Sequence, residues 1–111
     1  MGGEHELQSD IIEMIRWRGG VATRVNSGSA IFKRGGQTQV IKGADKGTSD
    51  IIACYQSRYL AIECKCGKNK PTPEQVEFGK TVNRAGGIFL VAYTLEEVEA
   101  ELDILDREGA Y

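Results

Sequence analysis

The sequence contains few cysteines and no long hydrophobic run, and each shortage excludes a class of protein. Three cysteines, an odd number, argue against a disulfide framework and fit a reducing compartment. No apolar stretch is long enough to cross a bilayer, and no signal-peptide pattern follows Met1. The sequence therefore predicts a soluble, intracellular protein.

The sequence also lacks a large excess of charge of either sign. The formal net charge is −2, which by itself predicts no nucleic-acid partner. The distribution of charge is more informative. Residues 16–46 contain seven basic residues and one acid, whereas residues 96–108 contain seven acids and one base. Such a split is compatible with one surface that faces an anion and one solvated acidic helix.

The N-terminal part of the chain predicts a helix, a short strand and then an irregular segment. Apolar residues from Leu7 to Ile15 recur at helical spacing, and the glycine pair at 19–20 ends this helix. The stretch "VATRV" (21–25) is typical of a short strand. Residues 26–48 are rich in glycine and polar residues, with brief apolar pieces "AIF" and "QVI". This segment is interpreted either as extra strands or as a surface excursion.

The middle of the chain predicts a β-hairpin and a second helix. In "GTSDIIACYQSRYLAIECKCGK" (47–68), two apolar arms flank a turn centred on Gln56-Ser57. Beyond the loop that follows, Thr72 can cap a helix, Pro73 suits its first position, and Gln75 can complete a capping box. This helix is expected to stop near the glycine pair at 86–87.

The C-terminal part adds one strand and one helix. "IFLVAY" (88–93) is an apolar run of strand length, which we expect to be buried on both faces. A second capping box at residues 94–97 opens an acidic helix that ends by Gly109. The order α-β-(irregular)-β-β-α-β-α predicts an α/β fold, with a mixed central sheet flanked by helices. With 111 residues, of which 41% are hydrophobic, the chain is expected to form one domain, 1–111, with one core.

The hairpin carries the candidate chemistry. If its turn is centred on Gln56-Ser57, residues whose numbers sum to 113 face each other, and Asp50 lies opposite Glu63. A two-residue or four-residue loop keeps this register, whereas a three-residue loop shifts it. Side chains alternate along a strand, so Glu63 and Lys65 share a face with Asp50. Facing carboxylates repel each other, and their Cβ separation of about 4.5–5.5 Å suits a bridging divalent cation such as Mg²⁺.

Other interpretations of these residues remain open. The pattern Asp-x(n)-Glu-x-Lys is weak, and it also describes a surface Glu-Lys pair with an unrelated aspartate at a strand start. A zinc or redox site is another alternative. Its ligands would come from His5, Cys54, Cys64 and Cys66, which lack the C-x-x-C spacing of a closed zinc site.

Further landmarks along the chain resemble a known nuclease family. "GTSD…IECK" resembles the PD-(D/E)xK nuclease core, and the wider chain is similar to its virus-type replication-repair nuclease branch, VRR-NUC, of the small stand-alone phage or bacterial type. "EHELQ" (4–8) matches the branch's Glu and Gln four residues apart, "RVNSG" (24–28) its R-x-N-x-G segment, and "PEQ" (73–75) its acid-Gln helix start. Two departures are Ser49, where the family has proline, and Cys64, where valine is common.

The resemblance implies a restriction-endonuclease-like fold and a Mg²⁺ or Mn²⁺ site. Asp50 and Glu63 would bind the metal with the backbone carbonyl of Cys64, and Glu4 would approach from the first helix. Glu6 is the competing candidate for that last role. Lys65 would position the attacking water and stabilise charge on the phosphate. Gln75 would contact the water or the phosphate, although the capping box explains it equally well.

The resemblance also implies DNA as substrate. The residues expected to hold its phosphates are Arg24, Lys33, Arg34, Lys42, Lys46, Lys68 and Lys70. Small members of this family resemble dimeric Holliday-junction resolvases, so we expect a homodimeric, structure-selective endonuclease without membrane partners. The alternatives are a nonspecific or flap nuclease and a noncatalytic DNA-binding module. Trp17 is expected to lie in the core or on a dimer surface. Phe32, Ile41 and Phe89 are further candidates for that dimer surface.

Overall fold

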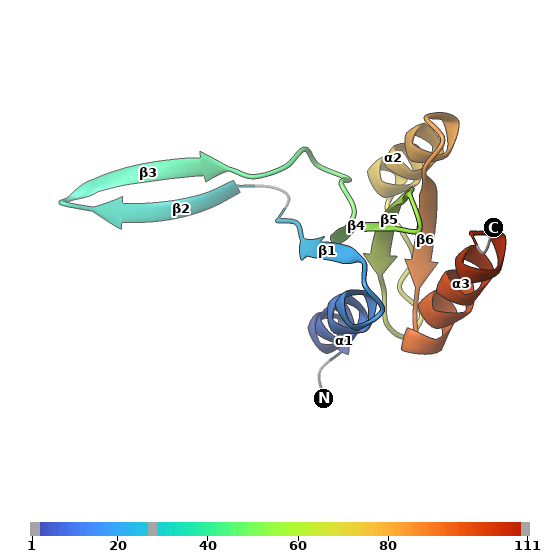
Figure 1. The fold of residues 1–111 in the computed structure, drawn as a ribbon. Helices are drawn as coiled ribbons and strands as arrows, with labels where there is room; N and C mark the ends of the chain where they lie inside the picture. The colour runs from blue at the N-terminus through green and yellow to red at the C-terminus, as the bar shows by residue number, and fades with distance from the viewer. Residues whose placement is uncertain (1–2, 27–28, 110–111) are drawn as a thin grey trace.

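The computed structural model describes residues 3–26 and 29–109, which form three helices and six strands (Figure 1). In chain order these elements are α1 (Gly3–Trp17), β1 (Val21–Arg24), β2 (Ser29–Arg34), β3 (Gln37–Lys42), β4 (Ile51–Tyr55), β5 (Arg58–Cys64), α2 (Pro73–Arg84), β6 (Ile88–Ala92) and α3 (Leu95–Glu108). None of the helices in the described part of the chain is long and apolar enough to cross a membrane.

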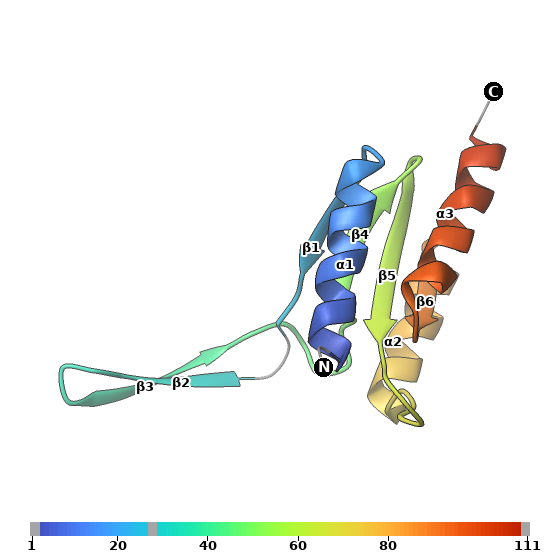
Figure 2. The same cartoon turned by 90° about the horizontal axis from the view of Figure 1, so that it is seen from below.

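Four strands form one mixed sheet in the order β1-β4-β5-β6. The β1-β4 and β4-β5 pairs are antiparallel, whereas β6 runs parallel to β5. Helices α1 and α3 lie against one face of this sheet and α2 lies against the other (Figures 1 and 2). The predicted α/β architecture, a mixed sheet flanked by helices, is therefore confirmed.

The hydrophobic core lies between the sheet and the α1/α3 layer. Helix α1 contributes Ile11, Ile12 and Ile15, all buried, because these positions fall on one helical face. Strand β5 contributes alternate residues, including Leu60 and Ile62, to the same core. The opposite face of β5 is thereby left to carry Glu63 toward α2.

The central hairpin has the predicted register. Ile51 pairs with Ile62 and Tyr55 with Arg58, so the residue numbers of each pair sum to 113. Only Gln56 and Ser57 form the turn, with φ values of 50° and 65°. Two successive positive φ angles define a type I′ turn, whose twist matches that of the flanking strands. Extending this register places Asp50, directly before β4, opposite Glu63.

Two expectations about buried residues are wrong. Strand β6 is not buried on both faces, since Ile88, Phe89, Leu90 and Val91 are half-buried and only Ala92 is fully buried. The reason is that β6 is an edge strand, with a neighbour only at β5. Of the two positions expected for Trp17, the core is wrong, because at the end of α1 its side chain is 87% exposed; the dimer surface stays a prediction.

The two predicted helix starts have the expected capping boxes. Thr72 caps α2 with Gln75 as its partner, and Thr94 caps α3 with Glu97. Helix α2 ends at Arg84, just before Gly86, which adopts a left-handed φ of 97°. Helix boundaries were therefore predictable from local chemistry.

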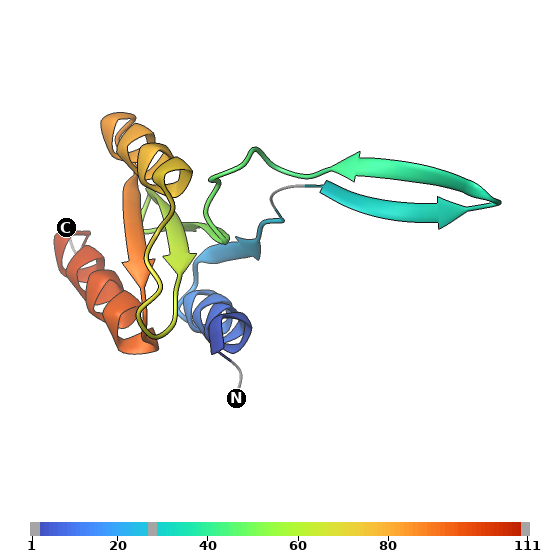
Figure 3. The ribbon, with the colours of Figure 1, turned by 180° about the vertical axis from the view of Figure 1, so that it is seen from behind.

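The glycine-rich segment 26–48 forms both extra strands and an excursion. Strands β2 and β3 pair antiparallel in a separate two-stranded sheet, with Ser29 opposite Lys42 and Arg34 opposite Gln37. We call residues 29–42 the arm, since they project away from the rest of the molecule (Figures 1 and 3). The expected dimer contributions of Phe32 and Ile41 fall on arm residues whose side chains lie outside the described ones.

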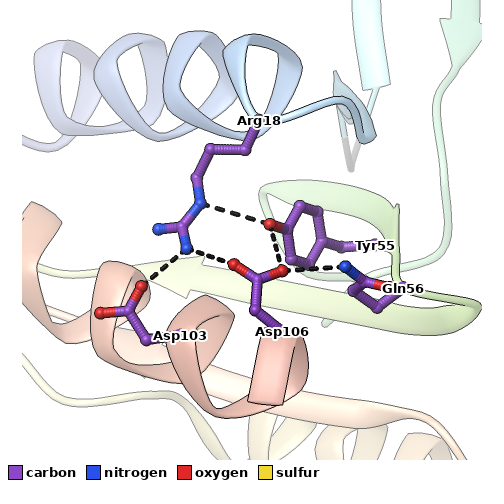
Figure 4. Close-up of polar contacts among 5 residues, drawn as sticks. All are labelled: Arg18, Tyr55, Gln56, Asp103 and Asp106. Carbon is purple, nitrogen blue, oxygen red and sulfur yellow. Dashed lines mark hydrogen bonds and ion pairs between the residues drawn. The ribbon is translucent and has the colours of Figure 1, made fainter. Parts of the chain in front are cut away.

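A polar cluster ties the ends of α1, β4 and α3 together (Figure 4). The Arg18 guanidinium donates to Asp103 at 2.6 Å, to Asp106 at 2.7 Å and to the Tyr55 hydroxyl at 3.3 Å. Asp106 also accepts hydrogen bonds from Tyr55 at 2.7 Å and from the Gln56 amide at 2.9 Å. These contacts add polar links between α1, the hairpin and α3 to the apolar core that the three elements share.

The hydrogen bonds that Asp106 accepts predict a pH dependence of stability. Bonds from Tyr55, Gln56 and Arg18 lower the pKa of Asp106 from 3.8 to about 2. A depressed native pKa gives stability that is present above pH 3.8 and is lost as the pH falls toward 2. The free energy of unfolding of the Asp106→Asn variant should therefore fall less over this interval than that of the wild type, in urea titrations at each pH.

A matched control is Glu99→Gln, which removes an exposed acid of the same helix that makes no ion pair among the described residues. This variant should keep the acid-dependent loss of the wild type. Equal acid sensitivity in all three proteins would contradict a role for the Asp106 carboxylate.

Candidate active site

Three segments meet on the α2 face of the sheet, where they form the candidate site. The segment before β4 carries Asp50, the end of β5 carries Glu63 and is followed by Lys65, and the first turn of α2 carries Gln75. Glu63 is 1% exposed, and the Lys65 side chain is 13% exposed. A buried carboxylate is rare unless it is paired or binds a metal ion.

Only one oxygen of the Glu63 carboxylate is satisfied. Its Oε2 accepts a hydrogen bond from Gln75 Nε2 at 2.6 Å and lies 3.5 Å from Lys65 Nζ. Its Oε1 is buried and has no hydrogen-bond partner among the described residues. Burial, and then the nearby Asp50 charge, raise the pKa of Glu63 to about 7, although Lys65 partly opposes this shift. Asp50 therefore lies close enough to Glu63 for the expected repulsion.

Asp50 is held in place through both its side chain and its backbone. Its Oδ2 accepts a hydrogen bond from the Cys64 backbone N–H at 2.9 Å. Its carbonyl accepts from the Val25 N–H at 2.8 Å, just beyond β1. The carboxylate is thus anchored to the neighbouring strand rather than free in solvent.

Gln75 forms the expected capping box, and it also contacts the buried carboxylate, which the sequence did not predict. Its Oε1 accepts from the Thr72 backbone N–H at 2.8 Å, and its own N–H donates to Thr72 Oγ1 at 3.2 Å, which completes the capping box. The remaining Nε2 group donates to Glu63. The helix cap therefore fixes the amide that holds the buried carboxylate.

The turn that leads to Asp50 packs closely against the first turn of α2. Gly47 has a left-handed φ of 93°, and a Cβ atom there would lie 2.6 Å from the Glu74 carbonyl oxygen. Only glycine satisfies both requirements. Ser49, which stands where the resembling family has proline, is buried, and its Oγ has no partner among the described residues. The close contact between Gly47 and Glu74 holds the segment that leads to Asp50 against the first turn of α2.

Glu4 lies at the start of α1, and its expected role at the metal stays a prediction. Its Oε2 lies 3.5 Å from Asn69 Nδ2, in the loop after β5. Burial, together with the carboxylates of Asp50, Glu63 and Glu4, raises the pKa of the Cys64 thiol to about 12. The competing candidate, Glu6, instead lines a hollow with Thr94 at the start of α3.

The sequence interpretation missed two residues that shape this edge. The Tyr93 hydroxyl donates to the Asn69 carbonyl at 2.6 Å, and Asn69 in turn contacts Glu4. A signal was available: parallel strands end at the same edge, so the residue after β6 lies beside the loop after β5. Tyr93 thereby fixes the loop that presents Lys68 and Lys70.

The predicted phosphate-binding residues lie in several different environments. Lys68 and Lys70 are exposed in the loop after β5, and Lys33 is exposed on the arm. Arg34 and Lys42 occupy ends of β2 and β3, and their side chains lie outside the described ones.

The other two predicted phosphate-binding residues already have protein partners. Arg24 donates to Gln8 at 2.8 Å and to Ser9 at 2.9 Å, so it also fastens β1 to α1. Lys46 lies 3.7 Å from Glu74, in an exposed ion pair. An exposed pair of this kind is weak and can exchange its partner for a phosphate.

The donor atoms fit a hard divalent cation better than zinc. Asp50 and Glu63 offer carboxylate oxygens, and Glu63 Oε1 is buried without a partner. Within residues 3–26 and 29–109, no group of three or more His, Cys, Asp or Glu side chains is placed to hold a metal ion. Mg²⁺ is commonly held by one or two carboxylates, with water and substrate phosphate completing its shell. The Cys64 thiol points into the core and does not join the cluster.

Comparisons with known proteins do not identify a family for this chain. Neither protein-family models nor curated proteins gave a match to this chain. Function therefore has to be argued from the Asp50, Glu63, Lys65 and Gln75 cluster and from the distribution of charge around it.

The burial of the Glu63 carboxylate is expected to lower the free energy of unfolding. In Glu63→Gln, the buried negative charge is replaced by a neutral side chain of the same shape, and the repulsion from Asp50 disappears. We expect the free energy of unfolding at pH 8, with chelator present, to rise by about 1 kcal/mol. Chemical denaturation measures this change.

Glu77→Gln, at an exposed acid of α2, is the control and should leave stability nearly unchanged. A clear loss of stability in Glu63→Gln would show that the carboxylate is a stabilising ion-pair partner rather than a strained group.

Proposed function

We propose that this protein is a metal-dependent DNA endonuclease of the PD-(D/E)xK type, similar to the VRR-NUC branch. The observation that carries the proposal is the buried Glu63 carboxylate, held by Gln75 and Lys65 beside Asp50. A buried, partly unsatisfied acid next to a second acid costs stability, which points to selection for function. The four-stranded mixed sheet with these acids at one end is compatible with a restriction-endonuclease-like core.

Each residue has a distinct task in this proposal. Asp50 and Glu63, with the Cys64 carbonyl, would hold Mg²⁺ or Mn²⁺, and Glu4 would bind a water of the metal's shell. The bound ion would supply positive charge to the phosphate oxygens and acidify water. Lys65 would orient the attacking water and offset charge that develops on the phosphate. Gln75 would keep the Glu63 carboxylate in position, since its other contacts are fixed by the helix cap.

The surroundings of the site support a polyanionic substrate. Lys68 and Lys70 are exposed in the loop directly after β5, and Lys46 lies beside the first turn of α2. Such cations bind phosphates regardless of base sequence, which favours recognition of DNA shape over sequence.

A homodimer that resolves four-way junctions is the most specific form of the proposal. A junction requires two paired cuts, and a two-fold dimer presents two sites at a fixed separation. The described residues form one four-stranded sheet with three helices and the arm, and they supply one candidate site per protomer. Paired nicking by a dimer, seen as linear duplex products from a cruciform plasmid, is the expected behaviour.

The nuclease proposal is tested by cleavage of labelled junction, flap, duplex and single-stranded DNA in Mg²⁺, Mn²⁺ or EDTA. We expect metal-dependent cleavage that prefers the junction, and a loss of about 100-fold or more in Lys65→Ala. Lys80→Ala, at an exposed lysine of α2, is the control and should cleave like the wild type.

Each contrary outcome selects a different alternative. DNA binding without cleavage in any metal would indicate a noncatalytic binding module. Equal cleavage of every substrate would indicate a nonspecific nuclease. Preferential cleavage of flaps, by a protein that analytical ultracentrifugation shows to be a monomer, would indicate a flap nuclease. Undiminished activity of Lys65→Ala would reject the site.

A further inference from the structure

The arm is the feature that the site does not explain. The molecule measures 58 × 32 × 29 Å, and the arm accounts for the long dimension (Figures 1 and 3). Strands β2 and β3 contact each other extensively, and neither packs extensively against another described helix or strand. An isolated two-stranded hairpin is at best marginally stable in water. The other described helices and strands therefore supply no extensive packing surface for the arm.

The composition of the arm favours an anionic partner. Residues 26–44 contain three basic residues, Lys33, Arg34 and Lys42, and no acid. Toward the tip, Lys33, Gln37, Thr38 and Gln39 are exposed, and these side chains can all donate hydrogen bonds. The tip itself is narrow, because Gly35 and Gly36 form a tight turn with φ values of 58° and 81°.

The base of the arm is joined to the candidate site. The Ala44 N–H donates to the Asn26 carbonyl at 2.8 Å, which closes the base. One residue before Asn26, the Val25 N–H donates to the Asp50 carbonyl at 2.8 Å. The arm therefore extends from the backbone that positions one of the two acids. A partner held along the arm would have a defined position relative to the site.

We propose that the arm lies in a groove of duplex DNA beside the bond that the site cuts, an inference that rests on the proposed nuclease function. A two-stranded β-ribbon fits the major groove. Strands of six residues extend about 20 Å, the length of about six base pairs. The arm thus requires a duplex flank of this length and makes the protein prefer branched DNA with long arms over short ones.

The test compares the wild type with Lys33→Ser/Arg34→Ser/Lys42→Ser. A matched control, Lys80→Ser/Arg84→Ser/Arg107→Ser, removes the same charge from α2 and α3. Binding to a junction with duplex arms of graded length is measured in EDTA, across a range of salt concentrations. Removing up to three phosphate contacts should make the slope of log association constant against log salt concentration less negative, by about 2–3. Affinity should fall by about tenfold or more in the arm variant alone.

The length dependence gives a second readout that folding defects cannot mimic. Wild-type affinity should rise as each duplex flank is lengthened to about six base pairs and then level off, whereas the arm variant should lose this rise. An unchanged salt slope and length dependence in the arm variant would overturn the proposal. Conversion of a dimer to a monomer by the arm substitutions, with unchanged affinity per protomer, would also overturn it and assign the arm to a second copy of the chain.

The outcome is separable from that of the proposed function. If the arm contributes to DNA binding in EDTA but no metal supports cleavage, the nuclease proposal fails and the arm's groove contact stands. If metal-dependent cleavage is normal in the arm variant on all flank lengths, the arm proposal fails and the nuclease proposal stands.

Discussion

The burial of one carboxylate beside another is the constraint on which the candidate site of this molecule depends. Glu63 is on a central strand, between β4 and β6, so it cannot escape to solvent. Its neighbours satisfy one oxygen, through Gln75 and Lys65, and leave the other without a partner. A chain selected only for stability would place an apolar side chain there. Cation binding is the simplest chemistry that offsets both the desolvation and the repulsion from Asp50.

The polar network around Arg18 and the candidate site lie at opposite ends of the sheet. At one end, Arg18, Tyr55 and Asp106 lock the helices to the hairpin turn through a satisfied polar network. At the other end lie Asp50, Glu63 and Lys65, where Glu63 Oε1 is buried without a hydrogen-bond partner among the described residues. The core between them lies on the α1/α3 face, so the α2 face is free to carry polar chemistry. Such an arrangement tolerates an unfavourable site because the remaining contacts are well satisfied.

The arm projects outward from the end of the sheet that carries the candidate site. It grows from the backbone that fixes Asp50, and it places basic residues well away from the sheet. If the proposed function holds, the arm would contact a longer stretch of DNA than the rest of the molecule covers. Cleavage and recognition would then be joined by two hydrogen bonds at the arm's base rather than by a second domain.

Local chemistry was legible in the sequence, whereas long-range placement was not. The two capping boxes, the hairpin register and the shared face of Glu63 and Lys65 follow from side-chain alternation and turn geometry, which depend on neighbours along the chain. The exposure of Trp17 and the half-burial of β6 depend on which strands lie at the edges, and no local pattern encodes that choice. The contact of Gln75 with Glu63 and the projection of the arm likewise arose only when distant segments packed together, because packing decides which polar groups meet and which remain in solvent.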